Sequence, residues 1–193
     1  MRKLDINAPV IIIFAAISFS VLVLCWLTGS HSTRLLFSVG RPRSLFDPLF
    51  YVRLFGHSLG HANLSHYLNN FIIILLVGPT LEEKYGTQRL LLMIAATSLT
   101  IGVLHSILSP NAMLLGASGV SFMMIILSSY VNVKAGKIPL TLLLCVVIFL
   151  GREITEQLQG GNGNISHFAH IIGGMCGAVF GFIIHKDKMK GRS

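Results

Sequence analysis

A serine between glycines stands at the start of an apolar segment, in the stretch Gly116-Ala117-Ser118-Gly119. Glycines allow backbone amides to approach a reacting group, and the first turn of a helix presents unpaired N–H groups at the positive end of its dipole. Both features stabilise the negative oxygen that forms when a nucleophile attacks a carbonyl group. Taken alone, the stretch is equally typical of an ordinary helix that begins at a Gly-Ser pair.

A histidine, His170, lies about one turn inside the last apolar segment of the chain. An ionisable side chain at such a position is costly in a membrane and indicates function, although a hydrogen bond to a backbone carbonyl would also satisfy it. Small residues spaced four apart let two helix backbones pack closely. The glycines that follow the histidine are Gly173, Gly174, Gly177 and Gly181, the last three on its own helix face. The pattern predicts close contact with another helix, and ordinary helix dimerisation would use the same pattern.

Ser118 and His170 together suggest nucleophilic catalysis by a dyad, in which the histidine takes the serine proton as general base. No carboxylate is available for a triad, because none of the seven acidic residues falls inside an apolar segment beside these two. The acidic residues are Asp5, Asp47, Glu82, Glu83, Glu153, Glu156 and Asp187. Phe122, one turn after the serine, would either stack on the imidazole or pack in the core.

Two further polar residues, His66 and Asn70, share one face of an earlier apolar segment by their four-residue spacing. With the backbone N–H of Ser118 they could stabilise an oxyanion; hydrogen bonding between helices is the alternative. A metal site formed by His57, His61 and His66 has no carboxylate to complete it, so we expect no metal and no cofactor. A serine, a histidine and two extra donors inside a membrane suggest a proteolytic site.

The composition places the chain among membrane proteins. Of its 193 residues, 53% are hydrophobic and only 11% are charged, and the mean hydropathy is +0.74. The net charge of +8 does not indicate nucleic-acid binding, since no basic fold motif accompanies it. Four of the basic residues form a short C-terminal tail that is suited to contact with anionic lipid. They are Lys186, Lys188, Lys190 and Arg192. The three cysteines, Cys25, Cys145 and Cys176, lie in apolar segments and give no disulfide framework.

Apolar segments of about 20 residues, the length that crosses a bilayer, predict six transmembrane helices. We expect an all-α membrane protein: one polytopic, six-helix domain covering residues 1–193. The expected helices are residues 9–28, 64–81, 88–108, 118–133, 138–158 and 166–185. The connection 29–63 is basic but also apolar, so we expect it to lie in the membrane interface and to be partly helical.

The distribution of basic residues predicts the orientation. If the N-terminus is cytoplasmic, ten basic residues lie on the inner side and five on the outer side. The positive-inside rule then puts both termini in the cytoplasm. The second, fourth and sixth helices start at the outer face, so His66, Asn70, Ser118 and His170 lie at similar depth. The composition and the lack of an organelle signal favour a bacterial inner membrane.

These residues resemble the motifs of the rhomboid family of intramembrane serine proteases. The resemblance extends from Arg53 to Gly181 and rests on four stretches in the family's order: 57–70, 81–86, 116–119 and 169–177. Two positions depart from it, because Val52 precedes Arg53 where rhomboids often have tryptophan, and Phe122 replaces a frequent tyrosine.

The resemblance implies a bundle with a water-filled outer cavity that cleaves transmembrane helices of other proteins. It implies Ser118 as nucleophile, His170 as general base, and His66 and Asn70 as oxyanion donors. The supporting positions are Gly116, Ala117, Gly119, Phe122, Gly173 and Gly177. It also implies lateral entry of substrate near the fifth helix.

Two other functions remain open from the sequence. One is a catalytically inactive rhomboid-like protein that binds membrane clients, which the presence of both Ser118 and His170 argues against. The other is a small transporter or channel, which would require polar groups along a continuous path. The expected partners are therefore transmembrane protein substrates and membrane lipids, with no nucleic acid, and the sequence leaves the oligomeric state open.

Overall fold

The computed structural model describes residues 7–40, 46–109, 111–130 and 164–190, with four further positions between 140 and 147. Its helices are α1 (Pro9–Leu27), α2 (His31–Leu36), α3 (Pro48–Gly56), α4 (Leu64–Tyr85), α5 (Thr87–Leu108), α6 (Ser118–Ser129) and α8 (Asn164–Lys190). In these ranges the only β-pairing is an isolated bridge between Val39 and Leu114. The expected fifth helix, 138–158, lies outside the described residues.

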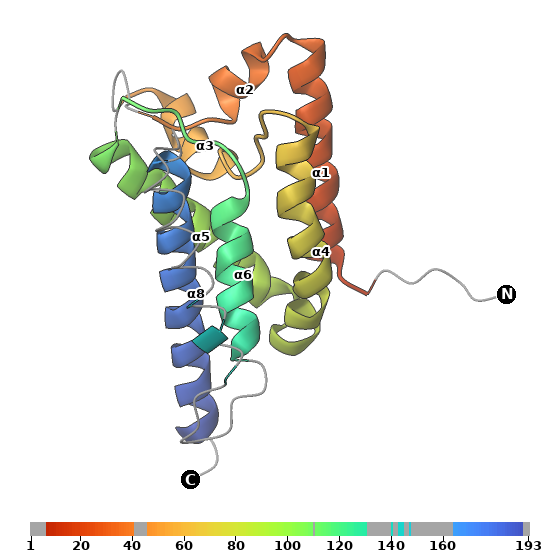
Figure 1. Ribbon diagram of the computed structural model, residues 1–193, viewed down its shortest axis with the longest axis vertical. Helices are drawn as coiled ribbons and strands as arrows, with labels where there is room; N and C mark the ends of the chain where they lie inside the picture. The colour runs from red at the N-terminus through yellow and green to blue at the C-terminus, as the bar shows by residue number, and fades with distance from the viewer. Residues whose placement is uncertain are drawn as a thin grey trace, which may run out of the picture.

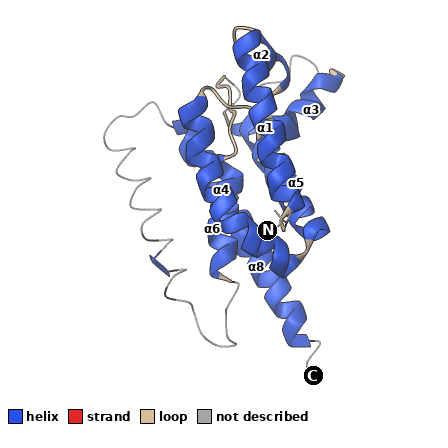
Figure 2. Cartoon of the chain, turned by 90° about the vertical axis from the view of Figure 1, so that its right-hand side faces the viewer, coloured by secondary structure: helices blue, strands red, loops and turns tan. Residues whose placement is uncertain are grey.

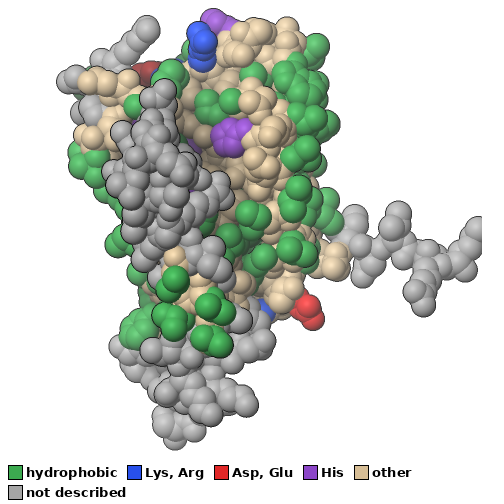
Figure 3. Space-filling view, in the orientation of Figure 1, with side chains coloured by type: hydrophobic (Ala, Val, Ile, Leu, Met, Phe, Trp, Pro, Cys, Tyr) green, Lys and Arg blue, Asp and Glu red, His purple; other side chains and the backbone are tan. Residues whose placement is uncertain are grey.

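Four described helices are long and apolar enough to cross a membrane: α1, α4, α5 and the His167–Ile184 part of α8. The shorter apolar helix α6 is enclosed by α4, α5 and α8, and the helices run roughly along one direction (Figures 1 and 2). Many large apolar side chains are exposed on the outer surface (Figure 3), as expected for contact with lipid. The predicted all-helical, polytopic membrane bundle is confirmed for the described residues.

The observed helix bounds differ from the expected ones in three helices: α4 continues past Leu81, α6 ends at Ser129 instead of residue 133, and α8 extends from Asn164 to Lys190. The sequence predicts that the second transmembrane helix ends at Leu81, whereas α4 continues to Tyr85. The reason is that Glu82 is only 3% exposed and faces the interior of the bundle. Gly86, with φ of +84°, then separates α4 from α5.

Glu82 joins three helices. Its two carboxylate oxygens accept hydrogen bonds from Val10 N at 3.0 Å and Ile11 N at 3.1 Å, in the first turn of α1. One of them also accepts the hydroxyl of Thr87 at the start of α5, at 3.0 Å. The first N–H groups of a helix have no partner within the helix, and a negative charge there is favourable. The carboxylate therefore fixes one end of α1 against α4 and α5.

The segment before α4 contains the two short helices α2 and α3, which lie at the other end of the bundle (Figure 1). Asp47 begins α3 by accepting a hydrogen bond from Leu49 N at 3.0 Å. Asn63 caps α4 in the same way, with His66 N donating to its side chain at 2.8 Å. This cap fixes the first turn of α4, the turn that carries His66.

Helices α6 and α8 approach so closely that only glycine fits at three positions of α8. A Cβ atom on Gly173 would lie 2.9 Å from Gly119 Cα and would overlap the Gly119 carbonyl. One on Gly177 would overlap the Met123 carbonyl, and one on Gly181 would meet the Tyr130 ring at 2.5 Å. The sequence placed Gly174 on this face, but its Cβ would have ordinary contact at 3.7 Å. The tight contact therefore runs through Gly173 instead.

Candidate active site

Ser118 is the first residue of α6 and is partly exposed. The chain enters this helix through Gly116, whose φ of +123° is a conformation that side-chain-bearing residues rarely adopt. Gly116 N donates a hydrogen bond to His57 O at 2.8 Å, which fixes the turn against the loop before α4. The serine is thus presented at the positive end of α6 by a rigid turn.

His66 packs against that turn. A Cβ atom on Gly116 would lie 2.7 Å from His66 Nε2, so glycine is also needed there to make room for the ring. Ala62 N donates a long hydrogen bond of 3.5 Å to His66 Nδ1. Because Nδ1 then acts as the acceptor, Nε2 carries the proton of the neutral ring and is the donor beside Gly116. This is the chemistry required of an oxyanion donor.

His170 lies on α8, 7% exposed, with its ring centroid 4.3 Å from that of Phe122 on α6. The Ala169 carbonyl oxygen would be only 2.9 Å from a Cβ atom on Gly119. The residue before the histidine therefore touches the residue after the serine. Because the helix backbones meet at this point, Ser118 and His170 lie on facing turns of α6 and α8.

His61 connects the oxyanion candidate Asn70 to the serine turn. Its Nδ1 lies 3.2 Å from Leu59 O, so this nitrogen is the donor. Its Nε2 is left as an acceptor, 3.3 Å from Ala117 N and 3.2 Å from Asn70 Nδ2. Burial, together with the neighbouring ionisable ring of His66, lowers the pKa of His61 to about 4, so the His61 ring is neutral at neutral pH. His61 thus orients both Asn70 and the entrance of α6.

The sequence suggests two roles for His61, as a metal ligand or as part of the family pattern. The available signal was its distance of nine residues from Asn70, but that signal does not distinguish a ligand from a hydrogen-bond acceptor. Within the described part of the chain, no three His, Cys, Asp or Glu residues are arranged to hold a metal ion. The rings of His61 and His66 instead pack edge to face, with centroids 5.0 Å apart.

His57 serves a structural purpose outside this cluster. It is 2% exposed, and its Nε2 lies 2.9 Å from Ser98 O on α5. Burial lowers its pKa to about 4, an effect to which nearby His105 adds. Together with its carbonyl bond to Gly116, this contact joins α5, the loop before α4 and the serine turn.

The rhomboid-domain family model matches residues 49–187, well over half of the chain. The chain belongs to the rhomboid family. It is 35% identical to Rhomboid-related protein 1 of Caenorhabditis elegans over 134 residues, which are 64% of this chain and 37% of the relative. It is 27% identical to RHOMBOID-like protein 2 of Arabidopsis thaliana over 133 residues, 64% of this chain and 39% of that relative. The rhomboid chain therefore matches well under half the length of these curated relatives.

The two departures from the family motifs now have a structural context. Val52 is 52% exposed on α3, so no tryptophan-sized core position is vacated there. Arg53 still organises this segment, since its Nε donates to Leu35 O at 2.6 Å and its guanidinium pairs with Asp47 at 3.4 Å. Phe122 lacks a hydroxyl but retains the ring contact with His170.

Proposed function

We propose that this rhomboid is an intramembrane serine endopeptidase that cleaves transmembrane segments of other membrane proteins. The observation that carries the proposal is the close crossing of α6 and α8, where Gly173 meets Gly119 beside the candidate dyad. A serine at a helix start, facing a histidine held by an aromatic ring, has the arrangement that nucleophilic catalysis needs.

In this mechanism, the Ser118 hydroxyl attacks the scissile carbonyl while His170 accepts its proton. The C=O electron pair moves to oxygen, and the oxyanion is stabilised by His66 Nε2, the Asn70 amide and the backbone N–H of Ser118. Collapse breaks the C–N bond, and His170 gives its proton to the leaving amine. A water molecule, deprotonated by His170, then hydrolyses the acyl-enzyme and restores the serine.

The substrate peptide bond must leave its helix before it can react. A helical carbonyl is hydrogen-bonded and enclosed, so we expect cleavage near helix-breaking residues such as glycine and proline. Lateral entry beside residues 138–158 remains a proposal, since that segment lies outside the described residues.

The protein is an integral membrane protein, and we propose that both termini are cytoplasmic in a bacterial inner membrane. The charge distribution supports this orientation. The first turns of α4, α6 and α8 lie in the same half of the bundle (Figure 1), which would then be the outer half.

Fluorophosphonate labelling tests the proposal without a known substrate. We expect the detergent-purified wild type to be labelled, and Ser118→Ala and His170→Ala to lose labelling. Ser65→Ala, which changes an exposed serine at the same end of the bundle, is the matched control and should label normally. A folded wild-type protein that remains unlabelled would favour the other candidate, an inactive rhomboid-like protein that binds membrane clients.

A further inference from the structure

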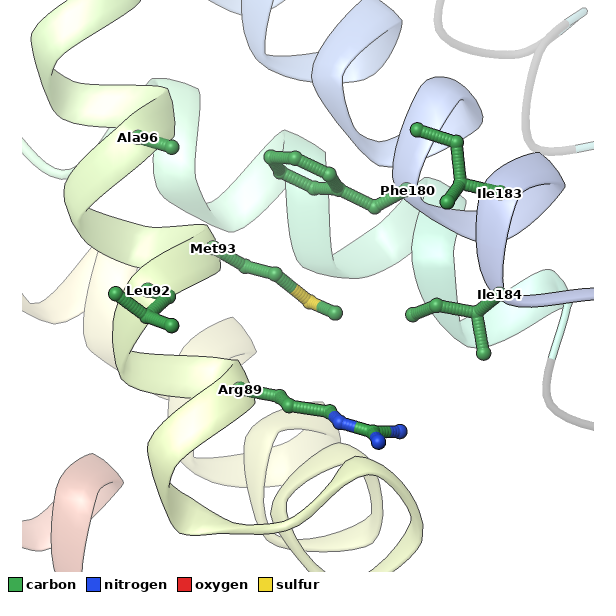
Figure 4. A pocket seen from close by; sticks show the side chains of 7 residues that line it. All are labelled: Arg89, Leu92, Met93, Ala96, Phe180, Ile183 and Ile184. Carbon is green, nitrogen blue, oxygen red and sulfur yellow. The ribbon is translucent and has the colours of Figure 1, made fainter. Parts of the chain in front are cut away.

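A groove separates α5 from α8 at the end of the bundle opposite the candidate active site. It measures about 620 Å³, within the usual range for small-ligand sites. Its lining residues are Arg89, Leu92, Met93 and Ala96 of α5, and Phe180, Ile183 and Ile184 of α8 (Figure 4). The α5 residues lie on one helix face by their three- and four-residue spacing, and so do the α8 residues. The groove is thus apolar along its length, apart from one cation.

Arg89 gives the groove its polarity. It lies in the first turn of α5, and its side chain extends into the space between the two helices near Ile184 (Figure 4). Arg89 is exposed, and its guanidinium has no ion-pair or hydrogen-bond partner among the described residues. An anion at Arg89 would complement this charge.

The groove covers the range of membrane depth that a lipid headgroup and the adjoining part of its acyl chain would occupy. From Arg89 to Ala96 the helix rises about 10 Å, which takes the groove from the helix end well into one leaflet. A charged headgroup at Arg89 would lie near the membrane surface, and a chain running past Met93 and Phe180 would lie in the hydrocarbon layer. If the N-terminus is cytoplasmic, this is the leaflet rich in anionic lipid.

The lining favours an acyl chain over another helix. Transmembrane helices that pack together use small residues at their contact, and the glycine surface of α8 is already occupied by α6 and Tyr130. The groove instead presents large flexible side chains, with Leu92 68% exposed and Ile183 50% exposed. Such a surface suits a flexible hydrocarbon chain.

We propose that this groove binds one anionic phospholipid, its phosphate held by Arg89 and one acyl chain lying between Met93 and Phe180. Arginine is suited to this contact because its planar guanidinium makes paired hydrogen bonds to phosphate oxygens. The site is separate from the candidate dyad, so it does not depend on proteolytic activity.

Native mass spectrometry of the full-length protein tests both parts of the site. The probes are palmitoyl-oleoyl phosphatidylglycerol and phosphatidylcholine, which have the same chains and different headgroup charge, at equal concentrations. We expect the wild type to retain at least about threefold more phosphatidylglycerol, and Arg89→Gln to remove that preference. Arg34→Gln, an exposed arginine on α2 at the other end, should keep it.

The acyl-chain part is tested by filling the groove. Ala96→Phe should reduce retention of both lipids, whereas Ala16→Phe, at an exposed position on α1, should not. The proposal would be overturned if the preference for phosphatidylglycerol survived Arg89→Gln, or if Arg34→Gln reduced that preference equally. Either result would show that the positive charge of the protein attracts anionic lipid without a specific site. The proposal would also be overturned if Ala96→Phe abolished a dimer while lipid retention stayed unchanged, because the occupant would then be a second copy of the chain. Thermal unfolding of each variant shows that its fold is retained.

Discussion

Histidine side chains in this site accept hydrogen bonds that fix both their own orientation and that of their neighbours. His61 accepts from both Ala117 and Asn70, so one neutral ring orients the serine turn and the proposed oxyanion donor Asn70. His66 obtains its donor orientation from Ala62. Because the two His61 contacts are buried, a substitution there removes both a group and the orientation of its neighbour.

Asn70→Ala should lower turnover by roughly ten- to a thousandfold, since it deletes one oxyanion donor while leaving Ser118 and His170 in place. The loss should appear mainly in kcat, because the oxyanion is absent from the bound substrate and develops on the way to the tetrahedral intermediate. His66→Ala should behave similarly. Asn69→Ala is the matched control, as its side chain is exposed on the same helix. Equal turnover in the two asparagine variants would reassign Asn70 to helix packing.

Acid should destabilise the protein through His57 and His61. Each pKa is lowered from 6.5 to about 4, so the unfolded state binds more protons than the folded state between these pH values. The free energy of unfolding should therefore fall as pH drops from 6.5 towards 4, by on the order of 3 kcal/mol for each histidine. Denaturant unfolding in detergent measures this slope.

Two histidine variants test whether a buried histidine causes this dependence of the free energy of unfolding on pH. His61→Gln should flatten the pH dependence between 4 and 6.5, because glutamine does not titrate there. His31→Gln, at an exposed position in α2, should leave the wild-type slope. Identical slopes in all three proteins would contradict a buried neutral ring at position 61.

At the scale of helices, the crossing of α6 and α8 sets the distance between Ser118 and His170, the proposed nucleophile and base. The two backbones meet where Gly119 faces Gly173 and where Met123 faces Gly177. Dispersion contacts dominate such crossings in a membrane, and they require close approach. A methyl group inserted here must separate the helices. Ser118 lies on α6 and His170 on α8 beside this contact, so the separation would also move these two residues apart.

Gly173→Ala should therefore cost both stability and activity, about 1–3 kcal/mol for overpacking. Gly174→Ala is the control one residue away, because its Cβ would have only a 3.7 Å contact with Ile126. It should be neutral or slightly stabilising, since alanine favours a helix over glycine by about 1 kcal/mol. Thermal unfolding and turnover of the two variants are compared. Equal effects of Gly173→Ala and Gly174→Ala would show that α6 and α8 can move apart without loss of stability or activity.

For the whole molecule, one carboxylate joins the three helices α1, α4 and α5 at the end remote from the site. Glu82 accepts from two backbone amides and one hydroxyl, and none of its hydrogen-bond partners in the described part of the chain is a basic side chain. Backbone groups that lack water must find partners inside the protein. This contact therefore contributes to the global fold and has no direct part in the proposed chemistry.

Glu82→Ala should lower the free energy of unfolding by about 3 kcal/mol or more, because it leaves the first amides of α1 and the Thr87 hydroxyl unpaired. Near 25 °C, the folded fraction should keep close to normal turnover. Glu83→Ala changes the exposed neighbouring carboxylate and should have little effect on the transition. Similar transitions for the two variants would show that Glu82 does not support the bundle.

The sequence by itself determined the membrane class, the positions of the described transmembrane helices, and Ser118 and His170 as candidate partners. It could do so because a bilayer requires long apolar segments, so the few polar residues inside them stand out. Only the tertiary structure decided that Glu82 is buried, that Gly173 makes the tight contact, and that His61 orients Asn70. These properties depend on contacts between residues far apart in the chain. A local sequence pattern does not indicate which helix packs against a given helix face.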